Sequence, residues 1–359
     1  MSKYYFDKES SQRAISFIER FCTHTKGELT KKPLLLEGWQ KEIVGNVFGW
    51  KDKKTNLRKY RTVFIAVPRK NGKTTLCAAI SLYMLFADSE RGSEVYAAAG
   101  DRNQAGIIFE IAKGMILQSS ELSSRSKVFR NSITHEAKGN FFQAISSDSK
   151  TKHGFNANCI IFDELHVQKN RDLWDALTTS TGARREPLTI AITTAGYDKQ
   201  SICYEVYNYA KRVLDGSIKD DSFYASIYEA DQDDDITSKK VWAKANPNLG
   251  VSLRGEYMER ESKRAIELPS YQNTFKRLML NIWTESQTQW IGHDEWMECH
   301  QEFDYSTLEG KECWGGLDLA STRDISAFVL LFNVDGKFIV QPHIFIPEEN
   351  AKKEVIEME

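Results

Sequence analysis

Residues 67–75, with the sequence VPRKNGKTT, contain the residue types of a phosphate-binding loop. Gly72 permits a tight turn, Lys73 supplies a positive charge for the β- and γ-phosphates of a nucleotide, and Thr74 supplies a hydroxyl for a magnesium ion. The first glycine of the usual G-x-x-x-x-G-K-[ST] pattern is missing, and Pro68, whose φ is fixed, could shape the exit from the preceding strand differently. This phosphate loop predicts nucleotide binding, although alone it is also compatible with a basic turn between a strand and a helix.

A pair of acids follows a buried apolar run in the stretch CIIFDEL, residues 159–165. In open α/β folds ligands bind at the carboxyl edge of the parallel strands, where Asp163 and Glu164 would lie. Asp163 can hold a magnesium-bound water near Thr74, and Glu164 is placed to orient and deprotonate an attacking water. The alternative is a helix start whose acids stabilise the helix dipole. Both motifs on strands of one sheet favour a site that hydrolyses a nucleotide.

A further apolar run ends in small hydroxyl residues, with Thr193 and Thr194 followed by Ala195 and Gly196. Hydroxyls at the end of a strand can sense the γ-phosphate of a nucleotide and relay its loss to other parts of a protein. A strand that ends in small residues is very common, so this stretch only supports the two motifs above.

The elements that must position these residues are predicted by alternating apolar runs. Continuous apolar runs rich in β-branched residues predict buried parallel strands at 62–68, 93–100, 158–164 and 188–196. Helices are predicted at 74–87 and 102–116. Strands that alternate with helices predict an α/β fold with an open, mainly parallel sheet.

The pattern changes twice after Gly196, and we therefore divide the chain into residues 1–200, 201–290 and 291–359. The second part is charged and amphipathic and predicts a mostly helical segment. The third contains three apolar runs, the last two of which, at about 327–332 and 338–344, are separated by an Asp-Gly hairpin signal. Because three strands alone would make a poor domain, we expect the third part to be truncated.

The composition excludes several classes of protein. The chain has 359 residues, 41% of them hydrophobic, and a formal net charge of −2, so a nucleic-acid site would need a local basic face. The longest apolar stretch is too short for a bilayer, which needs about 20 residues. Six scattered cysteines form no C-x-x-C pair and indicate free thiols in a reducing compartment. His293, Cys299 and His300 do not follow a zinc-site pattern. These features predict a cytosolic protein without membrane association.

Several stretches together resemble the large terminase subunits of tailed bacteriophages, the motors that pump DNA into empty capsids. The resemblance covers almost the whole chain and is carried by LEGWQKEIV (35–43), VPRKNGKTT (67–75), AAAGDRNQA (97–105), CIIFDELHV (159–167), GARREPLTIAITTAG (182–196), KANPNLGVS (244–252) and GGLDLASTRDISA (315–327). In that family the loop lacks the first glycine and carries an arginine, which Arg69 matches. The unusual loop entry is therefore the family's own form.

The resemblance implies a P-loop ATPase of the ASCE type with a mainly parallel central sheet, then a helical lid or linker subdomain, then the start of an RNase H-like nuclease. Arg69 would reach the phosphates or the transition state as an arginine finger does. Gln40 would read the adenine edge, although by itself it resembles a surface glutamine on an amphipathic helix. The expected nucleotide-binding residues are Gln40, Arg69, Asn71, Gly72, Lys73, Thr74 and Thr75. ATP and Mg²⁺ are the expected ligands, with Thr74 and Asp163 at the metal and Thr193, Thr194 and Gly196 as the coupling element.

For the nuclease, Asp318 in GGLDLAS matches the catalytic aspartate at the end of the family's first nuclease strand. Such sites hold two Mg²⁺ or Mn²⁺ ions between several carboxylates. The partner acids are expected beyond Glu359, so this chain by itself is not expected to cut DNA.

The function implied is ATP-driven translocation of double-stranded viral DNA into procapsids in the host bacterial cytoplasm, with cutting of concatemers by the full-length protein. Expected partners are DNA, the portal protein, the small terminase subunit and further copies in a ring on the portal, with a monomer in isolation. Arg102, Arg184 and Arg185 are alternative fingers acting between subunits. A helicase-like nucleic-acid ATPase and a non-catalytic nucleotide-binding scaffold are the alternatives.

Overall fold

The computed structural model describes residues 2–100, 102–146, 154–168, 170–285, 293–319 and 325–346. The chain separates into two compact units, residues 1–292 and 293–359.

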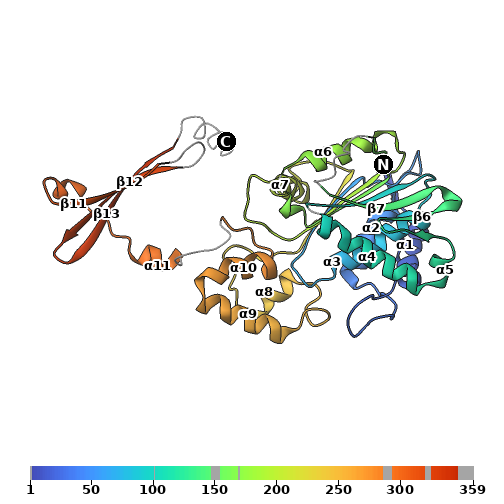
Figure 1. The fold of residues 1–359 in the computed structure, drawn as a ribbon, viewed down its shortest axis with the longest axis horizontal. Coiled ribbons are helices and arrows are strands. Elements are labelled where there is room, and N and C mark those ends of the chain that lie inside the picture. Colours follow the sequence, from blue (N-terminus) through green and yellow to red (C-terminus); the bar gives the residue numbers. More distant parts are fainter. Residues whose placement is uncertain are drawn as a thin grey trace. The chain divides into compact units, whose positions relative to one another are not determined.

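The four apolar runs predicted as strands form four neighbouring strands of one sheet in the first unit (Figure 1). They are β3 (Thr62–Ala66), β9 (Leu188–Thr193), β8 (Cys159–Asp163) and β4 (Glu94–Ala99), in that spatial order and all parallel. Among the described residues the sheet has eight strands, in the order β10-β3-β9-β8-β4-β7-β6-β5. The predicted α/β fold with a mainly parallel sheet is confirmed.

The remaining strands extend this sheet at both edges. β10 (Phe223–Ile227) pairs in parallel with β3, and β7 (Asn140–Ser146) pairs in parallel with β4. β6 (Ser132–His135) and β5 (Lys127–Val128) continue beyond β7 as antiparallel strands. β10 lies inside the segment expected to be mostly helical, because pairing with the outer edge of β3 outweighs its weak local pattern.

Both faces of the sheet are buried, as the continuous apolar runs require. Val63 and Ile65 of β3 belong to one core cluster, while Phe64 and Ala66 belong to another on the opposite face. The first face is covered by α1 (Lys8–Phe21), α2 (Gly38–Gly49), α3 (Lys73–Phe86), α4 (Arg102–Gln118) and α5 (Ser120–Ser123). The second is covered by α6 (Asp172–Thr179) and α7 (Ile202–Leu214). The site strands are thus fixed from both sides (Figure 1).

The first unit also contains a helical segment with its own small core. α8 (Lys239–Ala245), α9 (Gly255–Glu267) and α10 (Pro269–Leu280) pack around Trp242, Met258 and Phe275. A short antiparallel pair, β1 (Tyr4–Phe6) and β2 (Trp50–Asp52), lies near the start of the chain. Short 3-10 helices span Glu136–Lys138, Leu165–Val167 and Ser180–Ala183.

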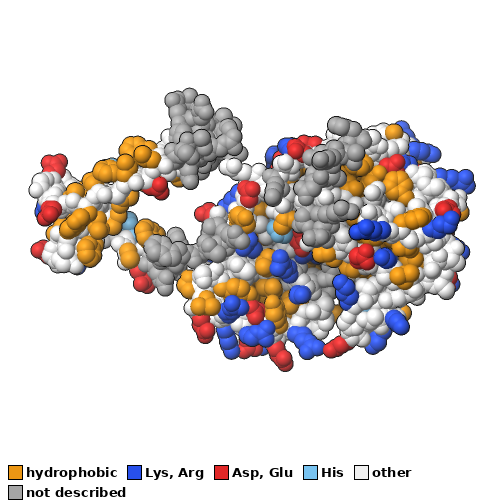
Figure 2. Space-filling model, viewed as in Figure 1, with side chains coloured by type: hydrophobic (Ala, Val, Ile, Leu, Met, Phe, Trp, Pro, Cys, Tyr) orange, Lys and Arg blue, Asp and Glu red, His pale blue; other side chains and the backbone are white. Residues whose placement is uncertain are grey.

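The second unit is a three-stranded antiparallel sheet, β11-β12-β13, with α11 (His293–Glu298) and the 3-10 helix Tyr305–Leu308 before it. The strands are β11 (Cys313–Asp318), β12 (Ser326–Val334) and β13 (Lys337–Phe345). Asp335 and Gly336, both with positive φ, form the predicted hairpin turn between β12 and β13. Figure 2 shows hydrophobic side chains along these strands, and Trp314, Leu317 and Phe338 are more than half exposed.

No helix in the described part of the chain is both long and apolar enough to cross a membrane. Four of the six cysteines are buried, whereas Cys299 and Cys313 are exposed.

Candidate nucleotide site at the carboxyl edge of the sheet

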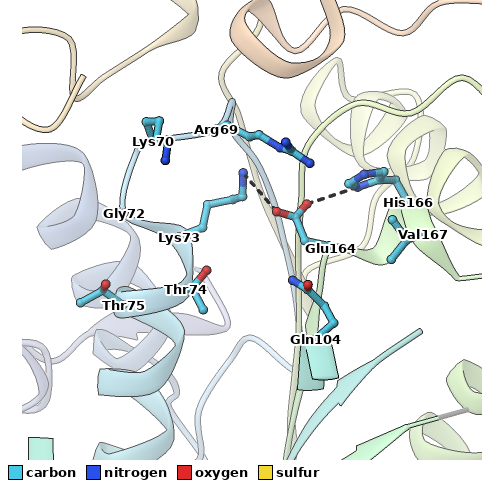
Figure 3. A pocket seen from close by; sticks show the side chains of 10 residues that line it. All are labelled: Arg69, Lys70, Gly72, Lys73, Thr74, Thr75, Gln104, Glu164, His166 and Val167. Atoms are coloured by element: carbon cyan, nitrogen blue, oxygen red, sulfur yellow. Dashed lines mark ion pairs between the residues drawn. The ribbon is translucent and has the colours of Figure 1, made fainter. Parts of the chain in front are cut away.

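The carboxyl ends of β3 and β8 bring the phosphate loop and Glu164 to one cavity of about 520 Å³. Because β9 lies between β3 and β8, the Thr193–Thr194 stretch sits between the phosphate loop and the acids. The cavity is lined by Arg69, Lys70, Gly72, Lys73, Thr74, Thr75, Gln104, Glu164, His166 and Val167. Figure 3 shows Lys73 and Glu164 facing each other, with His166 on the far side of Glu164 and Arg69 beside both.

The loop turns tightly before α3 because two of its residues adopt left-handed backbone conformations. Lys70 has a φ of 70°, and Gly72, the N-cap of α3, has a φ of 80°. Gly72 adopts this conformation without the steric penalty of a Cβ atom. α3 therefore begins at Lys73, and its first free N–H groups and positive dipole end border the cavity, as an anion site requires.

Lys73 is buried and fully engaged at the centre of the site. Its Nζ donates to the carbonyl oxygens of Val67 at 2.9 Å and Pro68 at 3.2 Å, and to the Thr194 hydroxyl at 2.6 Å. The nearest Glu164 oxygen lies 3.8 Å away. Burial lowers the pKa of Lys73, and the charge of Glu164 opposes that shift. The ammonium group is thus held in place by three neutral oxygens.

Glu164 is held by donors on one of its two carboxylate oxygens. Its Oε2 accepts from the Thr194 hydroxyl at 3.4 Å and lies 3.3 Å from Nδ1 of His166. Burial lowers the pKa of His166, which favours a neutral ring. Nδ1 also lies 3.1 Å from the Thr193 hydroxyl, which itself donates to the Thr194 carbonyl, so a proton on Nδ1 is shared between Thr193 and Glu164. Glu164 itself has a left-handed backbone with a φ of 50°. A non-glycine residue in this region is uncommon and costs energy, so the conformation is imposed by its surroundings.

Asp163, the last residue of β8, is almost completely buried. No hydrogen bond from a described residue to either carboxylate oxygen has good geometry, although the Gln104 side chain and the backbone N–H of Glu164 act on the carboxylate as weak donors that lower its pKa. Burial, with a smaller contribution from the charge of Glu164, outweighs them and raises the pKa of Asp163 to about 7. A carboxylate buried this deeply is a costly arrangement unless it has a ligand to bind.

Comparison with known proteins decides the family. Residues 38–212 match the model of the terminase large subunit ATPase domain, and residues 217–359 match the model of the terminase large subunit endonuclease domain. The chain belongs to the terminase large subunit family. Both matched domains are enzymatic in that family. The recognition made from the sequence motifs is therefore confirmed.

Individual relatives agree with this assignment. The chain is 29% identical to the terminase large subunit of Enterobacteria phage HK97 over 354 residues, which are 95% of this chain and 66% of that protein. It is 34% identical to protein YmfN of Escherichia coli (strain K12) over 204 residues, 55% of this chain and 45% of that protein. The crystal structure of the HK97 bacteriophage large terminase matches 97% of this chain and 70% of that chain, with 26% identity and a TM-score of 0.67. The chain thus spans about two thirds or less of the length of these curated relatives.

The family match also divides the chain differently from the folded units. The endonuclease model begins at residue 217, whereas the first compact unit extends to residue 292. β10 and the helices α8–α10 therefore fall within the endonuclease match but fold together with the ATPase sheet.

Two predicted nucleotide residues of this terminase site do not line the cavity. The Asn71 side chain is fully buried, and its amide bonds to Asn246 and to the main chain of Asn248. Gln40 is also buried, and its Oε1 accepts from the backbone N–H of Glu37 at 3.0 Å in a capping box that starts α2. Its Nε2 lies close to Gly72, since a Cβ built there would be 3.5 Å away.

Sequence reasoning missed four residues that line the cavity: Lys70, Gln104, His166 and Val167. His166 lies on the short 3-10 helix Leu165–Val167, which no sequence pattern indicated. Its position two residues after the predicted base, Glu164, could have identified it. Gln104, near the start of α4, follows β4 at the same sheet edge and gave no motif of its own.

The coupling stretch is joined to the segment after α10. The backbone N–H of Ala195 donates to Oδ1 of Asn281 at 2.7 Å, and the Asn281 amide donates to the Tyr228 carbonyl at 2.8 Å. A Cβ at Gly196 would lie 2.9 Å from the Trp283 ring, so the two segments pack without space for a side chain.

Other candidates lie away from this cavity. Arg184 bonds to the carbonyls of Asn156 and Gly92 at the opposite, amino edge of the sheet. Arg185 is exposed, and the side chains of Arg102 and His293 lie outside the described residues. Asp318 is exposed at the end of β11 in the second unit. In the described ranges no group of three or more His, Cys, Asp or Glu residues could hold a metal ion.

Proposed function

We propose that this chain hydrolyses ATP at the β3–β9–β8 edge and, within its full-length protein, uses the energy to translocate double-stranded viral DNA into procapsids. The observation that carries the proposal is the Lys73–Thr194–Glu164 hydrogen-bonded chain beside the buried Asp163. A scaffold without activity would gain nothing from a carboxylate buried this deeply beside that chain.

Phosphate binding falls to the loop and to the start of α3. The backbone N–H groups around Gly72 and the ammonium of Lys73 hold the β- and γ-phosphates. Arg69, which is exposed and lines the cavity, reaches the phosphates as charge develops on them. Gln40 meets the base, and Asn71 contributes its backbone.

The residues present fit a magnesium ion. Mg²⁺ prefers oxygen ligands, and the buried carboxylate of Asp163 and the cavity-lining hydroxyl of Thr74 can supply them. These two residues would hold the ion directly or through its waters. When bound, the ion neutralises charge that develops on the phosphates.

Glu164 is the general base. Its Oε2 is held by Thr194 and His166, so the carboxylate has a fixed orientation and Oε1 is the oxygen available to a water. The water is oriented and its proton taken as it attacks the γ-phosphate. Thr193, Thr194 and Gly196 pass the change at the γ-phosphate to the segment that contains Asn281 and Trp283.

We further propose residues 1–200 as the ATPase core, 201–290 as a lid or linker whose β10 extends and whose α7 covers the ATPase sheet, and 291–359 as the start of an RNase H-like nuclease. Asp318 contributes one carboxylate to a Mn²⁺ or Mg²⁺ site that cuts concatemeric DNA in the full-length protein. Figure 2 shows Lys and Arg side chains spread over the visible face of the first unit, where DNA phosphates could be met. The working assembly is a ring on the portal in the host cytoplasm, supplied with DNA by the small subunit, while the isolated chain is a monomer.

Phosphate release with and without double-stranded DNA tests the function. We expect hydrolysis by the chain, stimulated by DNA and lost to background in Lys73→Ala, because the phosphates lose their buried positive charge. Lys263→Ala, on the exposed face of α9, is the matched control and should keep full activity. Hydrolysis that persists in Lys73→Ala would place the activity elsewhere, and its absence from the unmodified chain with DNA would overturn the proposal.

A further inference from the structure

Three buried asparagines, whose side chains the proposed chemistry does not use, join the phosphate loop to the helical segment. Asn71 is in the loop, while Asn246 and Asn248 follow α8. Their side chains are 0%, 1% and 4% exposed. Buried amides at this depth cost energy unless their groups are paired.

Every polar group of the Asn71 side chain is paired. Its Nδ2 donates to Oδ1 of Asn246 at 2.9 Å and to the loop carbonyls of Pro68 and Arg69 at 3.2 Å each. Its Oδ1 accepts from the backbone N–H of Asn248 at 3.0 Å. The amide therefore has one allowed orientation, with its donor toward Asn246.

Asn246 and Asn248 are themselves anchored. Nδ2 of Asn246 donates to the carbonyls of Met279 at 2.8 Å and Trp242 at 3.1 Å, which joins α10 to α8. Oδ1 of Asn248 accepts from Nε1 of Trp39 on α2 at 2.6 Å. The loop is therefore tied to α2, α8 and α10 through two side chains.

These hydrogen bonds lie around the part of the loop with left-handed backbone conformations. Lys70 and Gly72, on either side of Asn71, both have left-handed backbones. The Lys70 carbonyl accepts from the Ser252 hydroxyl at 2.6 Å, and the backbone N–H of Arg69 donates to the Leu278 carbonyl at 2.9 Å. A lysine keeps a left-handed backbone conformation only where contacts with its surroundings hold it there.

We propose that Asn246 and Asn248 are positioning residues for nucleotide binding, which hold the phosphate loop in its binding conformation from the helical segment. The loop and helices α8–α10 then move as one body, so a change at the phosphates shifts the helices directly. The expected effect on ATP kinetics rests on the proposed ATPase function. The expected effect on the conformation of the loop does not.

Hydrogen exchange of the nucleotide-free chain tests the structural part. In Asn246→Ala the amides of residues 69–73 should exchange roughly tenfold faster, because opening the loop no longer breaks the buried tie. Asn140→Ala is the matched control: Asn140 is 1% exposed, makes two hydrogen bonds at 2.8 and 2.9 Å, and lies at the amino edge of the sheet. Equal exchange of residues 69–73 in the two variants would overturn the proposal, even if the chain proves unable to hydrolyse ATP.

Steady-state kinetics test the functional part. Asn246→Ala should raise the KM for ATP roughly tenfold, equivalent to about 1.4 kcal/mol, with a smaller change in kcat. Asn140→Ala should lower the melting temperature and leave KM unchanged, which separates positioning from stability. Ser252→Ala, at an exposed position, removes one tie without threatening the fold and should raise KM severalfold. An unchanged KM in both Asn246→Ala and Ser252→Ala would overturn the proposal.

Discussion

The ammonium group of Lys73 donates a 2.6 Å hydrogen bond to the hydroxyl of Thr194. Lys73 starts the helix that follows β3, and Thr194 follows the end of the neighbouring strand β9. Because the same hydroxyl donates to Glu164, the residue proposed to bind the phosphates and the proposed general base share one partner. Changing Thr194 therefore tests both proposed roles.

Thr194→Val should remove this shared partner while keeping the shape of the side chain. We expect kcat for ATP hydrolysis to fall at least about tenfold, because Glu164 loses a donor and Lys73 is left with an unpaired N–H. Thr194→Ser, which keeps the hydroxyl, should recover most of the rate. Steady-state phosphate release would measure both, and equal rates for the Val and Ser variants would contradict the role of the hydroxyl.

Glu164→Gln should bind ATP with near-normal affinity and lose turnover by about a hundredfold or more, because a neutral amide cannot accept the proton of water. Titration with a fluorescent nucleotide and a phosphate-release assay separate the two effects. Glu267→Gln, on the surface of α9, serves as a control that should behave as the unmodified chain. Normal turnover in Glu164→Gln would identify another residue as the base.

His166→Ala should lower kcat roughly tenfold with little change in KM, because Thr193 loses its hydrogen bond with Nδ1 and Glu164 loses the nearby Nδ1 that orients its Oε2. His166→Asn carries an amide N–H that can replace Nδ1 and should restore most of the rate. If His166 had only a structural role, the two variants would have the same kcat when their melting temperatures are equal.

The raised pKa of Asp163, about 7 against an ordinary value of 3.8, predicts a pH-dependent stability in the absence of Mg²⁺. Its folded pKa exceeds its unfolded pKa, so the folded state binds the extra proton and stability falls as pH rises through this window. Between about pH 5 and pH 8 the loss is on the order of 2–3 kcal/mol. Asp163→Asn cannot ionise and should lose correspondingly less stability, as urea unfolding at both pH values would measure. Identical pH dependence in the two proteins would show that Asp163 is already ionised in the folded chain.

The sequence predicted well those elements that are determined by residues close together in the chain. The four central strands are continuous apolar runs bounded by turns, and the loop and acids are recognisable by residue type and spacing. The placement of β9 between β3 and β8 was not predictable, since strand order depends on packing across the whole sheet. Asn246 was missed because its partner Asn71 lies 175 residues away in the sequence. Gln40 and Asn71 were assigned to the nucleotide by resemblance, and their buried hydrogen bonds require the folded chain to be seen.

The mismatch between the family boundary and the folded unit has a practical consequence for dissecting this protein. A protein shortened to residues 1–212, the end of the ATPase match, would keep the loop, both acids and Thr194. It would lack β10, and the outer edge of β3 would become an unpaired strand that invites association with other chains. It would also lose Trp283 from the core on the α7 face. An ATPase half intended for separate study therefore has to extend to about residue 285, well inside the segment that the family comparison assigns to the endonuclease.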